Sequence, residues 1–319
     1  MSTDGAASNR YAGRHAPRRA RVTTIVVGQA EGAWRRLIDY VALTKPRVVA
    51  MVLVTTAVGF HLGAAGSWNS TLLLYTLAGT ALAAGGTLAL NQYMERELDA
   101  RMNRTRHRPL PEGRLRPGEA LLLGCALVGA GVTVLFLAVE PVAAVVTAGI
   151  AIIYLLVYTP LKRVSSLCSL VGAIPGALPP VAGWAAARGT LGLESWILFA
   201  IMFLWQIPHT LAIGRMYRDD YARAGIRVLP VVDRNGWTTG VQAVCSCLAL
   251  LPVALLPTLI GLAGSTYFVV AFVLGVVFLW SAVRLARDGG SADARRLLFA
   301  SLVYLPVVLT VMALDKLTS

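Results

Sequence analysis

The segment Asn91–Asp99, with the sequence NQYMERELD, ends a long apolar run and carries acids and bases where a membrane segment should end. In a helix, Asn91, Glu95 and Asp99 are four residues apart, so that each is offset by about 40° from the one before it and all three lie on one face. Carboxylate and amide oxygens on one stripe suit a hard cation such as Mg²⁺, which takes one or two carboxylates together with substrate phosphates. We therefore predict that these three side chains bind a metal and act in catalysis.

Arginines follow this segment, within residues 100–110. Guanidinium groups bind phosphate oxygens bidentately, so arginines beside the acids indicate a site for a metal–diphosphate. Two ordinary explanations remain open, because acid–base pairs are common at solvated helix ends and arginines gather in cytoplasmic loops for topological reasons. The amide of Asn91, which is embedded in apolar sequence on the acidic stripe, favours the functional interpretation.

The composition indicates an integral membrane protein. Of the 319 residues, 56% are hydrophobic and only 14% are charged, whereas soluble domains carry roughly 25% charged residues. The net charge is +13, but the charges stand between apolar runs rather than on a separate polar domain, which argues against nucleic acid as a partner. The four cysteines lie in apolar runs without a Cys-x-x-Cys pair, and we assign them to packing: Cys125, Cys168, Cys245 and Cys247.

The first part of the chain differs from the rest. Residues 1–33 are polar and rich in arginine, so we expect a disordered basic cytoplasmic tail ahead of one intramembrane domain, residues 34–319. The tail lacks the long apolar core and cleavage site of a secretory signal, whereas its Arg-rich, acid-poor composition also suits an organelle transit peptide. Residues 34–45 predict a short interfacial helix with Trp34 and Tyr40 as anchors.

Nine apolar windows are long enough to cross a bilayer, which takes about 20 mostly apolar residues per helix. They are residues 46–66, 70–94, 118–138, 141–160, 166–186, 193–216, 238–262, 266–285 and 296–315. Prolines interrupt the fifth and sixth windows, and such breaks often lie near a cavity because they free backbone carbonyls: Pro175, Pro179, Pro180 and Pro208. The predicted fold class is an all-α membrane protein with about nine transmembrane helices.

The basic residues indicate the orientation in the membrane. All 29 Lys and Arg residues except Arg188 and Lys316 lie before or at the start of the first window, or at or after the ends of the second, fourth, sixth and eighth windows. The positive-inside rule makes these segments cytoplasmic, so the N-terminus lies inside and the C-terminus outside. Lys45 and Lys162 stand at two of these cytoplasmic ends, where topology alone could explain them. The polar segments therefore face the compartment that holds soluble phosphorylated metabolites.

A second polar constellation begins in the sixth window with Trp205 and His209 and continues with Tyr217 and Asp220. His209 and Asp220 are eleven residues apart, which is close to whole helical turns, so we predict that they share one stripe. Ionisable groups at membrane depth are costly and indicate function by default. A His that is merely hydrogen-bonded, and an Asp that merely pairs with a neighbouring arginine, remain the alternatives.

These residues resemble the motifs of the UbiA-type intramembrane prenyltransferases. The resemblance rests on Asn91-x3-Glu95-x3-Asp99, followed by Arg104-Thr105-x2-Arg108-Pro109-Leu110. Four further stretches resemble the haem-farnesylating members of that family: residues 43–47 (LTKPR), 172–180 (GAIPGALPP), 205–209 (WQIPH) and 220–230 (DYARAGIRVLP).

The resemblance implies nine helices around a central, lipid-accessible cavity with a cytoplasmic polar cap, in a bacterial plasma membrane or a mitochondrial inner membrane. It implies farnesyl diphosphate as donor, haem b as acceptor and Mg²⁺ as cofactor. By this match, the metal ligands and catalytic residues are Asn91, Glu95, Asp99 and Asp220. The diphosphate would be held by Lys45, Arg104, Arg108 and Lys162, and haem by His209, Trp205 and Tyr217. A downstream haem A synthase or terminal oxidase assembly is a further partner that the match suggests.

Two departures from the family pattern concern the metal. Glu95 stands where many members have Asp, and His209 and Tyr217 stand roughly where quinone-pathway relatives carry aspartates. The number of Mg²⁺ ions therefore stays open. Two other functions also stay open: prenyl transfer to an aromatic quinone precursor, and secondary transport, which would place polar groups near the bilayer middle rather than at one surface.

Overall fold

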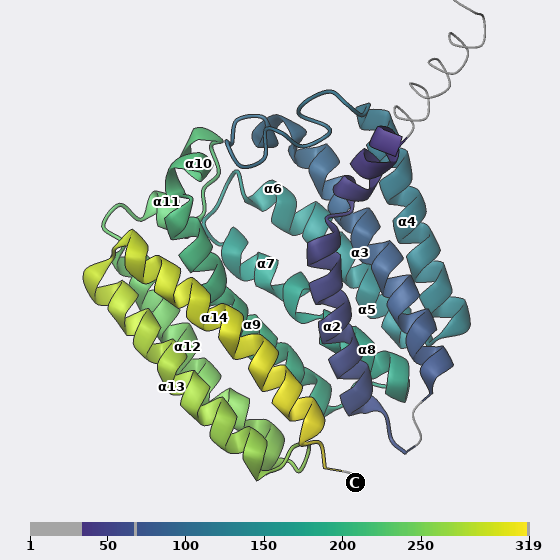
Figure 1. Cartoon of the computed structure of the whole chain (residues 1–319), viewed down its shortest axis with the longest axis vertical. Helices are drawn as coiled ribbons and strands as arrows, with labels where there is room; N and C mark the ends of the chain where they lie inside the picture. Colours follow the sequence, from purple (N-terminus) through teal and green to yellow (C-terminus); the bar gives the residue numbers. More distant parts are fainter. Residues whose placement is uncertain (1–33, 67–68, 318–319) are drawn as a thin grey trace, which may run out of the picture.

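A computed structural model describes residues 34–66 and 69–317 of the chain, so the predicted tail, residues 1–33, lies outside the described residues. The described part is helical, with one isolated β-bridge between Ala263 and Lys316. Residues 34–43 are helical, in agreement with the predicted interfacial helix. Figure 1 labels the remaining helices, which are α2 (Pro46–Gly63), α3 (Ser70–Asp99), α4 (Pro117–Ala138), α5 (Pro141–Ile152), the π-helix η1 (Ile153–Tyr158), α6 (Thr159–Leu161), α7 (Cys168–Ala177), α8 (Pro179–Arg188), α9 (Leu193–Met216), α10 (Arg218–Arg223), α11 (Leu229–Val232), α12 (Trp237–Leu259), α13 (Ser265–Asp288) and α14 (Ser291–Leu314).

Nine helical segments of the described chain are long and apolar enough to cross a membrane, and each corresponds to one predicted window. The prediction of an all-α membrane protein with about nine spans is therefore confirmed. The second span is longer than its window, because α3 continues as one helix to Asp99. This continuity makes the segment from Asn91 to Asp99 helical, as its four-residue spacing required.

The prolines break one span and not the other. The fifth span divides into α7 and α8 at Leu178, because the next two residues, Pro179 and Pro180, have no backbone N–H for the helical hydrogen bonds. In contrast, α9 passes through Pro208 without a break, so the expected interruption of the sixth window was wrong. Pro208 removes one helical N–H and thereby frees the carbonyl of Leu204 from its usual donor.

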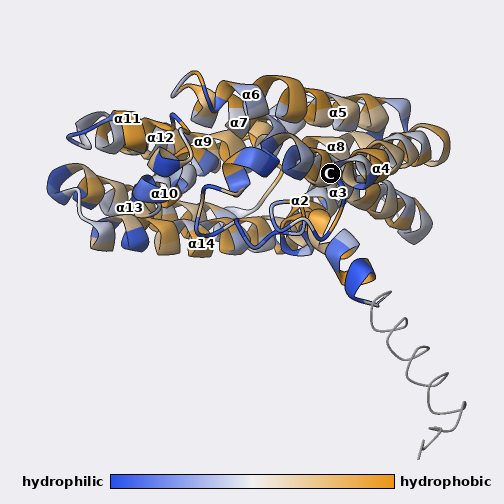
Figure 2. Ribbon diagram, turned by 90° about the horizontal axis from the view of Figure 1, so that it is seen from above, coloured by the Kyte–Doolittle hydropathy of each residue, from blue (hydrophilic) through white to orange (hydrophobic). Residues whose placement is uncertain are grey.

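The spans form a closed arrangement whose last helix returns to the first. The largest cluster of buried apolar residues joins helices from α7 to α14, and α14 contacts both α9 and α2. Figure 1 shows the loop between α3 and α4, together with α6 and α10, at one end of the molecule. Figure 2 looks onto the molecule from above and shows hydrophilic segments over its middle. Both polar constellations of the sequence thus lie at the same end.

Glycines allow α2 and α8 to approach each other closely. A Cβ atom on Gly59 would overlap the Pro180 carbonyl, and a Cβ atom on Gly183 would overlap the Thr56 carbonyl. Small residues at such contacts let membrane helices pack through their backbones, since lipid supplies no hydrophobic drive between helices. The α2–α8 contact therefore depends on the absence of side chains at Gly59 and Gly183.

The two basic residues that depart from the positive-inside pattern close the opposite end of α2. Arg188 Nε donates to the Gly63 carbonyl at 2.7 Å. Lys316 Nζ donates to the carbonyls of His61 and Ala64 at 2.8 and 2.6 Å. The last carbonyls of a helix have no partner within it, and cationic donors satisfy them favourably. Arg188 and Lys316 thus have a structural reason to stand at this end.

We predict that Gly183→Ala lowers the thermal unfolding midpoint of the purified protein in detergent. The added methyl group must displace the Thr56 carbonyl or separate the helices, and overpacking of this kind costs about 1–3 kcal/mol. Gly129→Ala in α4 is the matched control, because no heavy atom lies within 4 Å of a Cβ atom built there. Equal midpoints for Gly183→Ala and Gly129→Ala would contradict the close contact of α2 and α8.

Candidate active site

The centre of the site is the stripe of oxygen-bearing side chains on α3. Asn91, Glu95 and Asp99 occupy successive turns of the same continuous helix, and all three are buried. Buried carboxylates are costly unless a cation or hydrogen-bond donors meet them. The surroundings of this stripe must therefore supply positive charge.

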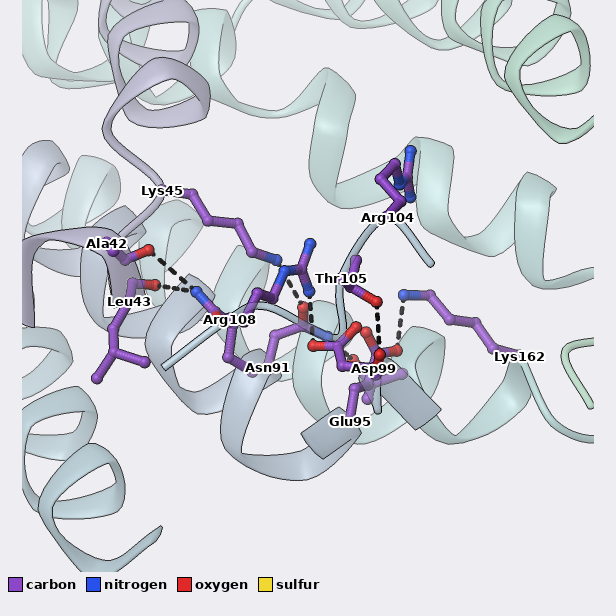
Figure 3. A network of polar contacts seen from close by, with 12 residues as sticks. Ala42, Leu43, Lys45, Asn91, Glu95, Asp99, Arg104, Thr105, Arg108 and Lys162 are labelled. Atoms are coloured by element: carbon purple, nitrogen blue, oxygen red, sulfur yellow. Dashed lines mark hydrogen bonds and ion pairs between the residues drawn. The ribbon is translucent and has the colours of Figure 1, made fainter. Parts of the chain in front are cut away.

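Each of the three side chains meets its own basic partner from another part of the chain, as Figure 3 shows. The pairs are Lys45 Nζ to Asn91 Oδ1 at 3.1 Å, Lys162 Nζ to Glu95 Oε1 at 2.7 Å, and Arg108 to Asp99 Oδ2 at 2.6 Å. The amide of Asn91 in turn donates to Thr159 Oγ1 at 3.2 Å. Three of the four predicted diphosphate ligands thus lie against the three predicted metal ligands of α3.

Lys45 reaches the stripe through an unusual backbone conformation. Its φ of 50° lies in the left-handed region, where it is the one non-glycine residue of the described chain, and Pro46 follows it. Such a conformation persists only where the surroundings hold it, and it is frequent at functional sites. Gln92 supplies the restraint, since its Nε2 donates to the carbonyls of Ala42 and Leu43 at 3.1 and 2.9 Å. The backbone before α2 is therefore fastened to α3 beside Asn91.

Burial, together with the neighbouring positive charges of Arg108 and Lys162, lowers the pKa of Lys45 to about 7, whereas Glu95 and Asp99 oppose the shift. An amine in this position gains its proton more readily when additional negative charge enters the site. The electrostatics therefore suit an anionic ligand that is more strongly charged than the two carboxylates of the stripe.

Lys162 is positioned by the π-helix η1. Tyr154 and Tyr158 of this helix lie side by side, with ring centroids 5.1 Å apart, and Lys162 Nζ lies 4.4 Å from the Tyr158 ring centroid. Thr159 Oγ1, which accepts from Asn91, donates to the Tyr154 carbonyl at 2.8 Å. π-Helical turns are often found at functional sites. This one joins the fourth span to the acidic stripe.

The loop after α3 folds back onto the stripe and also reaches the second constellation. Thr105 Oγ1 donates to the Asp99 carbonyl at 2.9 Å, which directs Arg108 toward the carboxylate of the same residue. Arg104 instead lies over the ring of Tyr217, 4.9 Å from its centroid, and approaches the Tyr221 hydroxyl at 3.4 Å. Of the four predicted diphosphate ligands, Arg104 is the one that bridges the two polar segments rather than contacting the stripe.

The second constellation packs against the first through apolar and backbone contacts. Leu98 and Met102 form a buried cluster with Ala224 and Ile226, and the backbone N–H of Arg227 donates to the Lys162 carbonyl at 2.8 Å. The two segments therefore form one continuous surface at the end of the bundle.

Asp220 lies in α10 and forms an ion pair with Arg223, one turn further along the same short helix. The predicted stripe shared by His209 and Asp220 was wrong, because α9 ends at Met216 and Tyr217 leaves the helical conformation. Because Tyr217 has a φ of −109° and a ψ of 27°, the residues on either side of it do not follow one continuous set of helical turns. Asp220 as a metal ligand stays a prediction.

His209 and Trp205 lie together but apart from the acids. Their rings stack with centroids 4.8 Å apart, and Trp205 Nε1 donates to the Ser301 carbonyl at 2.9 Å. His209 Nδ1 lies 2.8 Å from Ser301 Oγ. Tyr217, the third predicted haem contact, lies with Arg104 instead of with this pair. The structure thus separates a polar centre on α3 from an aromatic pair on α9.

Several side chains of the site were missed by sequence reasoning. Gln92, Thr159 and Ser301 carry no charge, and their types are common in membrane helices. Gln92 was the one with a local signal, because it stands beside Asn91 in an apolar run. The partners of Thr159 and Ser301 come from distant segments, and the local sequence around Thr159 and Ser301 gives no sign of these contacts.

The donor set fits a metal that arrives with a phosphate ligand. No group of three or more His, Cys, Asp or Glu side chains is placed to hold an ion among the described residues. The stripe provides two carboxylates and one amide oxygen instead. Mg²⁺ keeps this kind of sparse protein coordination and completes its shell with substrate phosphates and water. The residues present therefore fit Mg²⁺ bound together with a diphosphate.

The sequence profile of the UbiA prenyltransferase family matches residues 52–303, and the chain belongs to that family. A solved digeranylgeranylglyceryl phosphate synthase has the same fold, with a TM-score of 0.76 at 15% identity, over 88% of this chain and 98% of that one. A UbiA homologue from Archaeoglobus fulgidus, bound to GPP and Mg²⁺, has a TM-score of 0.60 at 16% identity, over 86% of this chain and 99% of that one. At these identities the likeness concerns the fold.

The sequence is more similar to one branch of the family. It is 48% identical over 287 residues to a protein named protoheme IX farnesyltransferase from Solibacter usitatus (strain Ellin6076), which covers 87% of this chain and 98% of the relative. A protein of the same name from Koribacter versatilis (strain Ellin345) is 42% identical over 288 residues, with 87% and 93% covered.

We predict that Lys162→Met lowers the unfolding midpoint more than the double substitution Lys162→Met with Glu95→Gln. The single change leaves a buried carboxylate without its cation, which costs about 3–5 kcal/mol, whereas removal of both charges avoids that penalty. Thermal unfolding in detergent measures both. Arg36→Met is the control, because its ion pair with Glu119 is exposed and such pairs contribute at most about 1 kcal/mol. A double variant as unstable as the single one would contradict a coupled pair.

Proposed function

We propose that this protein transfers the farnesyl group of farnesyl diphosphate to a vinyl group of haem b, which gives haem O. The observation that supports the diphosphate donor is the stripe on α3, where each of three side-chain oxygens accepts a hydrogen bond from its own basic residue. The identity with proteins named protoheme IX farnesyltransferase supports haem as the acceptor. The match extends over almost the whole length of those relatives, so it is not confined to one motif.

The cations of the site have a direct role in binding and in departure of the diphosphate. Arg108 and Lys162 supply two positive charges against the two carboxylates of the stripe, and Lys45 adds a third when an entering anion favours its protonated form. A diphosphate that enters beside them takes over part of these contacts, and guanidinium and ammonium groups stabilise negative charge as it develops on the leaving oxygen. The basic residues thus act on the donor before any acceptor is needed.

We assign the metal to the three side-chain oxygens of the stripe, which become available when the basic side chains turn to the diphosphate. Asn91, Glu95 and Asp99 would hold Mg²⁺, with Asp220 as a further ligand from α10. When bound, Mg²⁺ supplies Lewis-acid stabilisation to the diphosphate leaving group. The GPP- and Mg²⁺-bound structure of a UbiA homologue supports this choice of ion.

The reaction balances without a strong base. The C1–O bond of farnesyl diphosphate breaks, and the electron pair leaves with the diphosphate. The terminal carbon of a haem vinyl group forms a bond to C1, and water then adds to the inner vinyl carbon and loses a proton. The products are the hydroxyethylfarnesyl haem, diphosphate and one proton. Carbocation character during these steps has to be kept from premature capture by water, and a site enclosed by apolar helices favours that.

His209 and Trp205 are assigned to haem. An imidazole is a common iron ligand, and an aromatic ring stacked beside it offers an apolar face to a porphyrin. The diphosphate centre and the haem contacts therefore come from different helices, α3 and α9. The membrane is proposed to be a bacterial plasma membrane, with the active end and the N-terminus in the cytoplasm, as the positive-inside pattern indicates.

We predict that the purified protein, incubated with haem b, farnesyl diphosphate and Mg²⁺, converts haem to a product heavier by one farnesyl group and one hydroxyl group. Mass spectrometry of the extracted haem measures this. A hydroxybenzoate offered in the same reaction should remain unmodified. Farnesylation of the hydroxybenzoate with haem unchanged would overturn the acceptor assignment, and absence of any farnesyl transfer would overturn the function.

In the same assay, Asp99→Asn and Asn91→Ala should each lower turnover by about 100-fold or more, which is the scale of losing one preorganised stabilising group. Glu97→Gln is the matched control, because Glu97 is an exposed acid on the same helix. All variants should retain a cooperative unfolding transition in detergent. Normal turnover of folded Asp99→Asn or Asn91→Ala would remove the metal assignment.

A further inference from the structure

A buried serine on α14 contacts both aromatic residues assigned to haem. The carbonyl of Ser301 accepts from Trp205 Nε1 at 2.9 Å, and its hydroxyl oxygen lies 2.8 Å from His209 Nδ1. Ser301 itself is fully buried. The last span of the chain thus holds the orientation of two side chains of the sixth.

The protons of this cluster have only one consistent arrangement. A serine hydroxyl has a single hydrogen, and Ser301 Oγ lies 2.6 Å from the carbonyl oxygen of Leu298, which can only accept. If the hydrogen pointed to His209 instead, two oxygens would face each other at that distance without a proton between them. The hydroxyl therefore donates to Leu298 and accepts from His209. The imidazole accordingly carries its proton on Nδ1, and Nε2 keeps a lone pair.

We propose that Ser301 is a positioning residue that holds His209 in the tautomer whose Nε2 can bind haem iron. The inference rests on the proposed function, in which His209 is a haem contact. Histidines that bind metals usually donate the other ring N–H to a nearby acceptor, which sets both the tautomer and the ring orientation. Ser301 provides that acceptor, and the carbonyl of the same residue holds the stacked Trp205.

The test compares ferric haem b binding to the full-length protein and to its variants by absorption spectroscopy. Ser301→Ala should weaken haem binding by about 10- to 100-fold and change the Soret band, since loss of such a hydrogen-bond partner typically has that effect. Ser301→Thr keeps the hydroxyl and should restore the wild-type spectrum. Ser281→Ala is the control, because that buried hydroxyl on α13 donates only to the Val277 carbonyl.

The experiment also includes the haem spectrum of His209→Ala and an assay of haem farnesylation with farnesyl diphosphate. If His209→Ala alters the haem spectrum while folded Ser301→Ala leaves spectrum and affinity unchanged, the positioning role is wrong and His209 remains a ligand. If neither variant alters the spectrum, His209 is not a ligand of the haem iron and the positioning role of Ser301 is also wrong. Farnesylated haem from the wild-type protein decides the proposed function separately. In Ser301→Ala, the KM for haem should rise while the KM for farnesyl diphosphate stays unchanged.

A second feature lies on the outer side of the hairpin formed by α13 and α14. A cavity of about 690 Å³ lies between these helices. Near the hairpin turn it is lined by Arg284, Arg295 and Arg296, with Asp293 as the neighbouring acid. Further from the turn its lining is apolar and includes exposed aromatic side chains such as Phe299. The lining thus changes from basic to apolar along the direction of the helices.

The charges of this groove are only partly balanced. Asp293 pairs with Arg284 at 3.7 Å and with Arg296 at 3.0 Å, whereas Arg295 forms no ion pair among the described residues. Arg215 of α9 donates to the Gly289 carbonyl at the turn, so the basic end lies at the same end of the bundle as the active site. Basic pockets between membrane helices on the cytoplasmic side recognise anionic lipid head groups. We infer that this groove binds an anionic phospholipid, with its phosphate at the arginines and its acyl chains along the apolar part.

The test measures thermal unfolding of the protein in nanodiscs of phosphatidylcholine with and without phosphatidylglycerol. Phosphatidylglycerol should raise the midpoint of the wild-type protein, and Arg295→Gln should remove at least half of that shift. Arg287→Gln is the control, because Arg287 stands near the same turn but lines a different cavity. An equal shift in wild type and Arg295→Gln, or no shift at all, would overturn the site. A lipid-free dimer in native mass spectrometry that Arg295→Gln dissociates would make the groove a subunit interface and exclude the lipid.

Discussion

Carboxylates buried at the end of a membrane helix are costly unless positive charge meets them, and this constraint organises the active end of the protein. Glu95 pairs with Lys162 at the end of the fourth span, and Asp99 pairs with Arg108 of the loop after α3. Asn91 accepts a hydrogen bond from Lys45, which lies in the segment before α2. Three distant pieces of chain are thereby held around one helix. The same matching prepares the site for a ligand, because a diphosphate and its cation can take the places of the paired groups.

Close helix packing and local breaks allow these pieces to meet. Gly59 and Gly183 let α2 approach α8 through the backbone. The π-helix before Thr159 turns the end of the fourth span so that Lys162 reaches Glu95. Two irregular features lie at the site, the π-helix and the left-handed backbone of Lys45, and such conformations are often found at functional sites.

Much of the fold and part of the site followed from local sequence patterns. Nine spans were predicted correctly because a helix in lipid must satisfy its backbone internally and needs about 20 apolar residues to cross. The stripe of Asn91, Glu95 and Asp99 was predictable because a four-residue spacing has one meaning along an unbroken helix. The same reasoning failed between His209 and Asp220, since Tyr217 interrupts the helix there. At Pro208 the sequence predicted a break in the sixth span, whereas α9 continues through this residue.

The sequence by itself therefore determined the membrane class, the number of spans and the oxygen-bearing stripe, since each depends on residues that are neighbours along the chain. Only the tertiary structure decided which cation meets which oxygen, because Lys45 and Asn91 are 46 residues apart and Lys162 and Glu95 are 67 residues apart. It also placed His209 beside Ser301, a serine 92 residues away. Such pairings depend on how whole helices pack, and the packing of membrane helices depends on contacts that no local spacing records.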